Sequence, residues 1–198
     1  ITFDKKDYVN ALNYFKQLQT LAQTTENKNI GRLGVLRCSY FLNDHQTTVN
    51  IVNEIMADPL SSEELKAEAR FNRAKAYLAI GQSPQAISDL KLISTDTRTA
   101  RGAESKYLLA NVYFEQNKMT DAENEVLDFS KKNTPHQFWL ARSFVLLSDV
   151  YIKNGDDFQA KQYLLSLQKN YKVADEIQTL ITERLTAISL REKNTVIN

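Results

Sequence analysis

The sequence is poor in the residues that turn or cross-link a chain. Its 198 residues include only 5 glycines, 3 prolines and 1 cysteine. A β-sandwich or β-barrel needs a tight turn about every ten residues, so this scarcity argues against both folds and favours helices. Cys38 has no cysteine partner, which excludes an internal disulfide and any zinc site built from several cysteines.

An excess of charge of one sign is also missing. The 25 basic and 24 acidic residues are scattered along the chain and leave a net charge of +1. No overall field therefore attracts nucleic acid, and we expect no nucleic-acid partner. No apolar run approaches the roughly 20 residues that span a bilayer, so we expect no direct membrane insertion.

The common motifs of catalytic and metal sites are absent as well. His45 and His136 lie far apart and belong to no HxxxH or HExxH motif, and the sequence has no GxxxxGK[ST], GxGxxG or GxSxG. Asp156 and Asp157 follow Gly155, but the remaining ligands of a calcium loop are missing. We therefore expect no enzyme, no cofactor and no metal site.

What the sequence does contain is a recurring pair of residues, a tyrosine followed nine positions later by a small residue. The stretch AYLAIGQSPQAISDL, residues 76–90, shows one copy, with apolar residues at helical spacing on both sides of Gly81. Four copies occur, at Tyr40 with Val49, Tyr77 with Ala86, Tyr113 with Ala122, and Tyr151 with Ala160. Their tyrosines are 37, 36 and 38 residues apart, which predicts consecutive helix-turn-helix units.

Polar residues at the expected helix starts support these units. Ser61 and Thr120 each precede a glutamate by three residues, and Asp156 precedes a glutamine by three. This spacing is typical of a capping box, in which the first side chain accepts a backbone N–H of the new helix. The small residues of the recurring pairs would let two helices approach closely. We expect Ala122 to lie at such a contact.

These residues resemble the tetratricopeptide repeats, whose pattern combines an aromatic residue, a leucine, a small residue, a tyrosine, a turn glycine and an alanine. The best match is Phe144, Leu147, Ser148, Tyr151, Gly155 and Ala160. The resemblance covers about residues 4–170 and implies an all-α superhelix of antiparallel helix pairs. Arg70 and Lys106 replace the leading aromatic residue, and Asp44 and Asn117 replace the turn glycine.

The repeat phase predicts that residues 1–198 form a single solenoid. It would begin with the second helix of a truncated repeat at 4–22, whose small residue is Ala11. Four repeats are expected at about 30–57, 67–94, 103–130 and 138–169. A capping helix at 174–191 would cover the last repeat with one apolar face, formed by Ile177, Leu180, Ile181, Leu185 and Ile188.

The family's pattern places function on a concave surface lined by the first helices. The resemblance implies that ten residues point inward there: Phe41, Phe71, Lys75, Leu78, Tyr107, Asn111, Phe114, Val145, Asp149 and Ile152. Several are apolar or aromatic, so the groove is expected to accept an extended segment or an amphipathic helix of a protein partner. The alternative is that the same rings only fill gaps between helices.

One class of partner is set aside at this point. Family members that dock chaperones hold a C-terminal carboxylate with lysine, asparagine and arginine on successive first helices. Here Lys75, Asn111 and Arg142 fall on that surface, but Gly34 and Cys38 occupy the corresponding positions of the preceding unit. Neither of these two residues can bind a carboxylate, and we therefore exclude this class.

The sequence thus predicts a non-catalytic protein-interaction scaffold that presents its groove to a peptide or protein. We expect a fragment of a larger bacterial protein, because the chain starts within a repeat and without methionine. The long interval is similar to that of cell-envelope members of the family, which favours the periplasm or the outer membrane over the cytoplasm. Two alternatives stay open: a non-catalytic appendage of an enzyme, and a homodimer formed through an exposed terminal repeat. The balanced charge argues against a third, an RNA-binding helical repeat.

Overall fold

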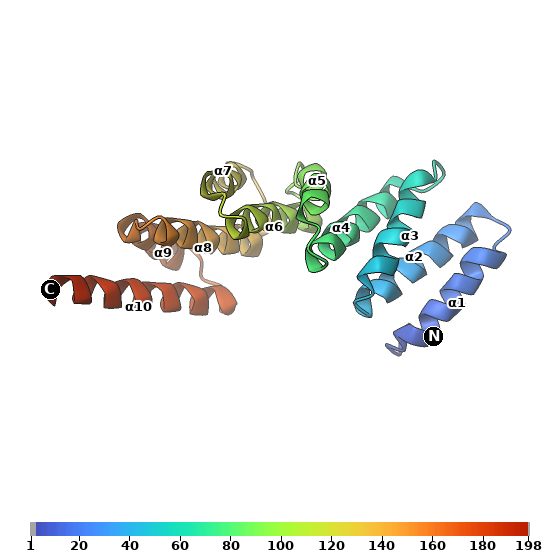
Figure 1. Cartoon of the computed structure of the whole chain (residues 1–198), viewed down its shortest axis with the longest axis horizontal. Coiled ribbons are helices and arrows are strands. Elements are labelled where there is room, and N and C mark those ends of the chain that lie inside the picture. The colour runs from blue at the N-terminus through green and yellow to red at the C-terminus, as the bar shows by residue number, and fades with distance from the viewer. Residues whose placement is uncertain (1–2, 198) are drawn as a thin grey trace. The chain divides into compact units, whose positions relative to one another are not determined.

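The computed structural model describes residues 3–197, and this part of the chain is helical without any strand. Ten helices follow one another (Figure 1): α1 (Tyr8–Leu21), α2 (Thr25–Phe41), α3 (His45–Ala57), α4 (Glu63–Ala79), α5 (Ser83–Ile93), α6 (Ala100–Glu115), α7 (Met119–Ser130), α8 (Gln137–Lys153), α9 (Asp157–Asn170) and α10 (Glu176–Ile197). Within α1 to α5 and within α6 to α10, neighbouring helices along the chain pack against each other as antiparallel pairs. The predicted all-α fold of consecutive helix pairs is confirmed.

Side-chain oxygens accept backbone N–H groups in the first turn of seven of the described helices. The accepting residues are Asp7, Thr24, Asp44, Ser62, Thr99, Asp156 and Asp175. Asp156 was predicted, and its carboxylate accepts the backbone N–H of Gln159 at 2.9 Å.

Two predicted caps are wrong. Ser62 caps α4, whereas Ser61 is buried in the preceding turn, where its backbone N–H donates to the carbonyl of Asp58. Thr120 lies inside α7, because the turn before this helix is completed at Lys118, which takes the N-cap position two residues before Thr120.

The same tight turn joins the two helices of four pairs. Each turn contains one residue in the left-handed region: Asn43 (φ 55°), Gly81 (74°), Asn117 (59°) and Gly155 (79°). In every turn the N–H of this residue donates to the carbonyl three residues earlier, and the next N–H donates to the carbonyl five residues earlier. Glycine and asparagine adopt this conformation with the least strain, which explains their place in the repeat.

These turns show that the first pair lies one residue away from the predicted register. Its left-handed residue is Asn43, whereas the sequence comparison had assigned the turn position to Asp44. The N–H of Asp44 donates to the carbonyl of Ser39, just as the N–H after Gly81 donates to Tyr77. Ser39, and not Tyr40, is therefore the equivalent of the recurring tyrosine.

The small residue of the first pair shifts by the same step. Thr48, rather than Val49, stands nine residues after Ser39 and is fully buried, like Ala86, Ala122 and Ala160 of the later pairs. The hydroxyls of Thr48 and Ser39 are hydrogen-bonded at 3.1 Å. The first pair thus joins its helices through two small polar residues where the later pairs use tyrosine and alanine.

The chain divides into two compact units, Ile1–Ile93 with α1 to α5 and Ser94–Asn198 with α6 to α10. In the first unit, α2 packs against α1, α3 and α4, and α4 also packs against α3 and α5. A core cluster of Leu36, Cys38, Val52 and Ile55, all fully buried, lies among these helices. The single solenoid stays a prediction.

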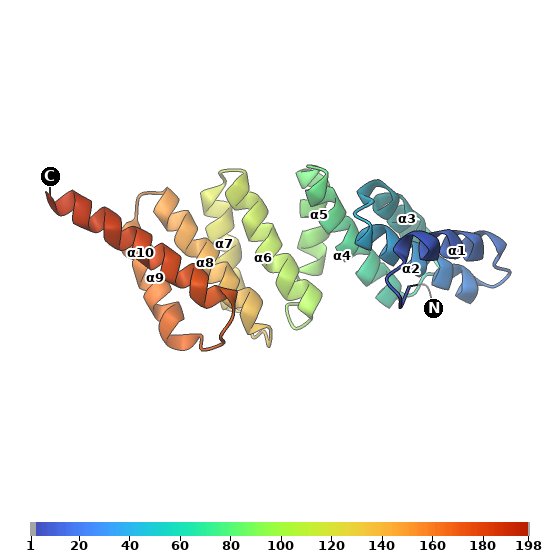
Figure 2. The ribbon, with the colours of Figure 1, turned by 90° about the horizontal axis from the view of Figure 1, so that it is seen from below.

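In the second unit, α6 pairs with α7 and α8 pairs with α9, while α8 also packs against α6 and α7. The last helix, α10, lies against α8 and α9 (Figure 2). Its isoleucines at 177, 181 and 188 are fully buried and form a cluster with Ala160 and Leu164 of α9. This contact is what the sequence predicts for the apolar face of a capping helix.

Candidate protein-interaction surface

The first helices of the four pairs, α2, α4, α6 and α8, each carry three equivalent positions at helical spacing i, i+4 and i+7. Counting back from the left-handed residue of each turn gives Leu33, Arg37 and Tyr40 on α2, Phe71, Lys75 and Leu78 on α4, Tyr107, Asn111 and Phe114 on α6, and Val145, Asp149 and Ile152 on α8. The last nine are the predicted inward residues. Only the positions on α2 differ from the prediction.

Phe41 does not belong to this set, because the register shift puts Tyr40 in the place equivalent to Leu78. The Phe41 ring is 51% exposed and stacks on Tyr8 of α1, with ring centroids 4.7 Å apart. The Phe41 ring also contacts Phe3 and Tyr40 edge-on, each with centroids 5.9 Å away. Phe41 thus packs against the N-terminal segment.

Arg37 is the residue of this set that the sequence comparison missed. It occupies the position of Lys75, to which Cys38 had been assigned, and Cys38 is fully buried, which raises the pKa of its thiol. Arg37 donates through Nε and Nη2 to the carboxylate of Glu68 at 2.7 and 2.9 Å. The sequence comparison was therefore wrong to find no charged residue at this position, because Arg37 stands there and pairs with Glu68. The exclusion of a carboxylate partner loses this argument.

On α4, a lysine bridges two aromatic rings of the first unit. The ammonium of Lys75 lies 5.4 Å from the ring centroid of Tyr40 and 5.2 Å from that of Phe71. Phe71 is only 9% exposed, and Leu78 is half-buried. Most of the Phe71 ring therefore packs inside the unit, where the ammonium of Lys75 makes a cation–π contact with it.

On α6 and α8, three aromatic rings and one arginine form a cluster in the second unit. The ring of Tyr107 stacks on Trp139 with centroids 5.6 Å apart, and Trp139 contacts Phe138 at 5.0 Å. The guanidinium of Arg142 lies 5.2 Å from the Tyr107 centroid and 6.0 Å from that of Phe138. Trp139 was outside the predicted inward set, and the signal for it is the pair of aromatic residues in the first turn of α8.

The other two positions of α6 continue this surface. The side-chain amide of Asn111 donates to Glu115 at 2.8 Å, which orients it along the helix. The ammonium of Lys153 lies 5.0 Å from the ring centroid of Phe114. Tyr107, Asn111 and Phe114 are all half-buried, so each keeps part of its surface in contact with solvent.

The three predicted residues of α8 face α10 instead of solvent. Val145 is 3% exposed and belongs to the cluster that contains Ile177 and Ile181, and Ile152 packs against the same cluster. The carboxylate of Asp149 accepts Nε and Nη2 of Arg184 at 2.7 and 2.8 Å, and this hydrogen bonding raises the pKa of the arginine. With α10 in place, these residues are engaged within the chain.

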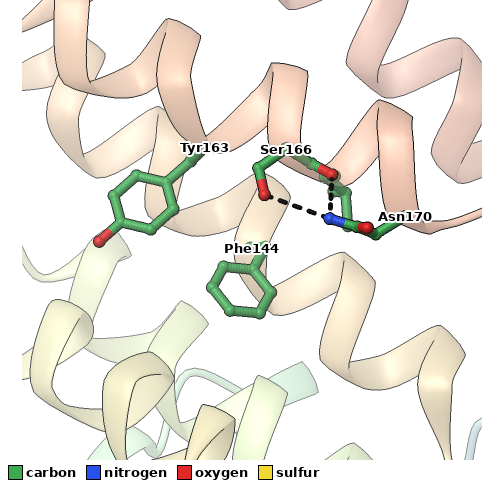
Figure 3. A pocket seen from close by; sticks show the side chains of 5 residues that line it. Phe144, Tyr163, Ser166 and Asn170 are labelled. Atoms are coloured by element: carbon green, nitrogen blue, oxygen red, sulfur yellow. Dashed lines mark hydrogen bonds between the residues drawn. The ribbon is translucent and has the colours of Figure 1, made fainter.

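Two hollows lie between α8 and α9, and the sequence patterns did not predict either. The first has a volume of about 280 Å³ and is lined by Phe144, Tyr163, Ser166, Leu167 and Asn170 (Figure 3). The second has a volume of about 210 Å³ and is lined by Gln137, Leu140, Ala141, Phe144, Leu167, Asn170 and Tyr171. Repeat patterns show which faces are buried, but they do not show where two packed helices leave space.

The helix pair that forms these hollows also has a family match. Residues 137–172 match a family model described as Tetratricopeptide repeat. The chain contains a tetratricopeptide repeat. The match covers α8 and α9, the last of the predicted repeats, and confirms the resemblance there. No curated protein matches the chain.

The fold of a tetratricopeptide repeat protein is typically non-catalytic, and the described residues offer no metal centre. Within residues 3–197, no group of three or more histidine, cysteine, aspartate or glutamate side chains could hold a metal ion. No helix in this part of the chain is both long and apolar enough to cross a membrane. The repeat and the all-helical fold instead support a scaffold for protein interaction.

Proposed function

We propose that this tetratricopeptide repeat protein binds a peptide or protein segment on the first-helix surface of its second unit. This surface consists of Tyr107, Asn111 and Phe114 on α6 with Trp139 and Arg142 on α8. The observation that carries the proposal is that the Tyr107 ring of α6 contacts both Trp139 and the guanidinium of Arg142 on α8.

The residue types of this surface favour binding. Tryptophan, tyrosine and arginine supply most of the binding energy at protein interfaces, because they combine large apolar area with polar groups. Tyr107 and Arg142 already hold each other in place, so a partner has little side-chain freedom to remove on binding. Phe114 adds an apolar contact two turns further along α6. These features suit an extended segment or an amphipathic helix with apolar anchor side chains.

The experiment that tests this proposal is affinity capture with matched variants. The wild-type chain, the double variant Tyr107→Ala with Phe114→Ala, and the control Tyr14→Ala are each immobilised and exposed to a lysate of the cells that make the protein. Tyr14 is a suitable control, because its ring is 61% exposed on α1 and lies outside the proposed surface. Circular dichroism verifies that all three chains are folded.

We expect the wild type and the control to retain the same bound proteins, and the double variant to lose at least one of them. Truncation of an interface anchor costs about 2 kcal/mol or more, which lowers affinity roughly 30-fold. A captured partner that remains bound equally well to the double variant would place the binding site elsewhere on the chain.

A cell-envelope location is a separate proposal, which is supported only by the repeat interval of 36 to 38 residues. Fractionation of the producing cells followed by detection with an antibody tests it. Recovery of the protein with the periplasm or the outer membrane is the expected result, and recovery in the cytoplasmic fraction alone contradicts it.

A further inference from the structure

The two hollows between α8 and α9 form one continuous furrow, since Phe144, Leu167 and Asn170 line both of them. We call the nine residues that line the two hollows the α8–α9 furrow. Their volumes, about 280 and 210 Å³, are each below the roughly 300 Å³ at which pockets for drug-sized ligands begin. The size of each hollow suits a single side chain of a larger partner.

The lining of the furrow determines which chemistry it accepts. Charged residues make up 25% of the sequence, yet none of the described residues that line the two hollows is charged. A charged ligand group would lose its hydration there without gaining an opposite charge, which is costly. The furrow therefore selects an uncharged ligand.

Two side-chain amides give the furrow its polar character. Asn170 Nδ2 donates to the carbonyl and the hydroxyl of Ser166 at 2.8 and 3.4 Å (Figure 3), and Gln137 Nε2 donates to the carbonyl of Thr134 at 2.8 Å. Both side chains are exposed, and neither Asn170 Oδ1 nor Gln137 Oε1 accepts a hydrogen bond from a side chain or backbone group that the structure describes. The donors are used within the chain, and two acceptor oxygens remain for the N–H groups of a ligand.

The aromatic wall of the furrow is fixed before any ligand arrives. Phe144 and Tyr163 stack with centroids 6.0 Å apart, and Tyr163 stacks on Tyr151 at 5.5 Å. The Tyr151 hydroxyl donates to Glu123 of α7 at 2.5 Å, which anchors the three rings to the neighbouring helix. A preorganised wall reduces the ordering cost of binding.

From the neutral lining and the two acceptor oxygens, we infer that the α8–α9 furrow binds an uncharged, extended peptide segment of a partner. Alternate apolar side chains of the segment enter the two hollows, and its backbone N–H groups donate to Asn170 Oδ1 and Gln137 Oε1. The furrow is a second binding site, formed by residues that do not include Tyr107, Asn111 or Phe114. The inference therefore does not depend on the function proposed for the first-helix surface.

The test is a nuclear magnetic resonance titration of the full chain, labelled with ¹⁵N, with three capped hexapeptides. All three carry leucine and phenylalanine at alternate positions, and the positions between them are serine in the first peptide, aspartate in the second and lysine in the third. The side-chain amide signals of Asn170 and Gln137 report directly on the furrow. We expect these signals to shift and saturate with the serine peptide, and the two charged peptides to bind about tenfold more weakly because their charges lose hydration.

A pair of charge-introducing variants locates the binding. Ser166→Glu puts a carboxylate on the rim of the furrow, and Gln168→Glu puts the same group on the opposite face of α9; both positions are exposed, so both variants are expected to fold. The serine peptide should bind Ser166→Glu about tenfold more weakly than the wild type and should bind Gln168→Glu normally.

Three results would overturn the inference. The first is that the serine peptide shifts neither amide signal. The second is that each of the three peptides binds Ser166→Glu with the same affinity as Gln168→Glu. The third is that sedimentation shows a wild-type dimer that Ser166→Glu dissociates, because the occupant would then be a second copy of the chain. Loss of partner capture by the Tyr107 and Phe114 variant leaves this titration unaffected, so the two proposals can fail separately.

Discussion

Small buried side chains set the distance between the two helices of each pair. Thr48, Ala86, Ala122 and Ala160 are fully buried at equivalent positions, and each lies nine residues after the residue that begins the turn. At such a site, the facing helix leaves no room for a larger group. The helix pair therefore depends on the size of one side chain.

Replacement of Ala122 tests this dependence. Ala122→Phe should lower the free energy of unfolding by about 1 to 3 kcal/mol, because the ring must push α6 and α7 apart. The control is Asn124→Phe, which introduces the same ring at an exposed position of α7. Urea denaturation followed by circular dichroism gives both values. Equal stability of Ala122→Phe and the control would contradict this role of Ala122.

The hydroxyl of Tyr171 provides a second test at the residue scale. Burial, together with its hydrogen bond to Asp175 Oδ2 at 2.5 Å, raises the pKa of Tyr171 to about 12. In the unfolded chain this tyrosine ionises at about pH 10, so its contribution to stability is constant below that pH and decreases as pH rises toward 12.

Tyr171→Phe removes both the hydrogen bond and the ionisation. We expect the stability difference between wild type and variant to be constant at neutral and mildly alkaline pH and to shrink between about pH 10 and 12. Urea denaturation at a series of pH values measures it. A difference that stays the same up to pH 12 would show that Tyr171 has an ordinary pKa.

At the scale of the element, α10 is attached to α8 and α9 by an apolar seam and by ion pairs along its length. Arg142 pairs with Glu176, Asp149 with Arg184, Asp157 with Arg191, and Lys161 with Glu192. These pairs are partly exposed and contribute little individually. Burial of the isoleucines therefore accounts for most of the stability of the contact.

Substitutions on the two faces of α10 test the contribution of its buried isoleucines. Ile181→Ala should lower the free energy of unfolding by about 2 to 5 kcal/mol, because Ile181 is fully buried and its loss leaves a cavity. Leu190→Ala, on the exposed face, should change it by less than about 0.5 kcal/mol. Thermal or urea denaturation measures the free energy of unfolding of both variants. Similar losses of stability in the two variants would mean that α10 does not pack as described.

Helices and their order could be predicted from the sequence because apolar residues recur at helical spacing and turn residues interrupt them. Exact register was harder to obtain. Tyr40 and Val49 repeat the spacing of the later pairs by coincidence, whereas Asn43 in the left-handed turn identifies Ser39 and Thr48 as the true equivalents. The backbone hydrogen bonds of the turn determine which residues of two pairs are equivalent. The sequence pattern alone does not show these hydrogen bonds.

At the scale of the whole molecule, the sequence predicted which residues of α6 share a face, since one turn register fixes Tyr107, Asn111 and Phe114 together. It did not predict that α10 covers Val145 and Asp149, because the docking side of a capping helix is set by packing between distant segments. Nor did it predict the α8–α9 furrow, which is a gap between helices. Partner chemistry thus has to be inferred from the assembled surface.

The central claim is that the face of α6 containing Tyr107 and Phe114 contacts a partner. Photo-crosslinking tests it most directly, with benzoylphenylalanine placed in turn at Asn111, between these two residues, and at Leu165 on the outer face of α9. We predict that a crosslink to a partner protein forms from position 111 and not from position 165. A partner crosslinked from position 165 and never from position 111 would contradict the account.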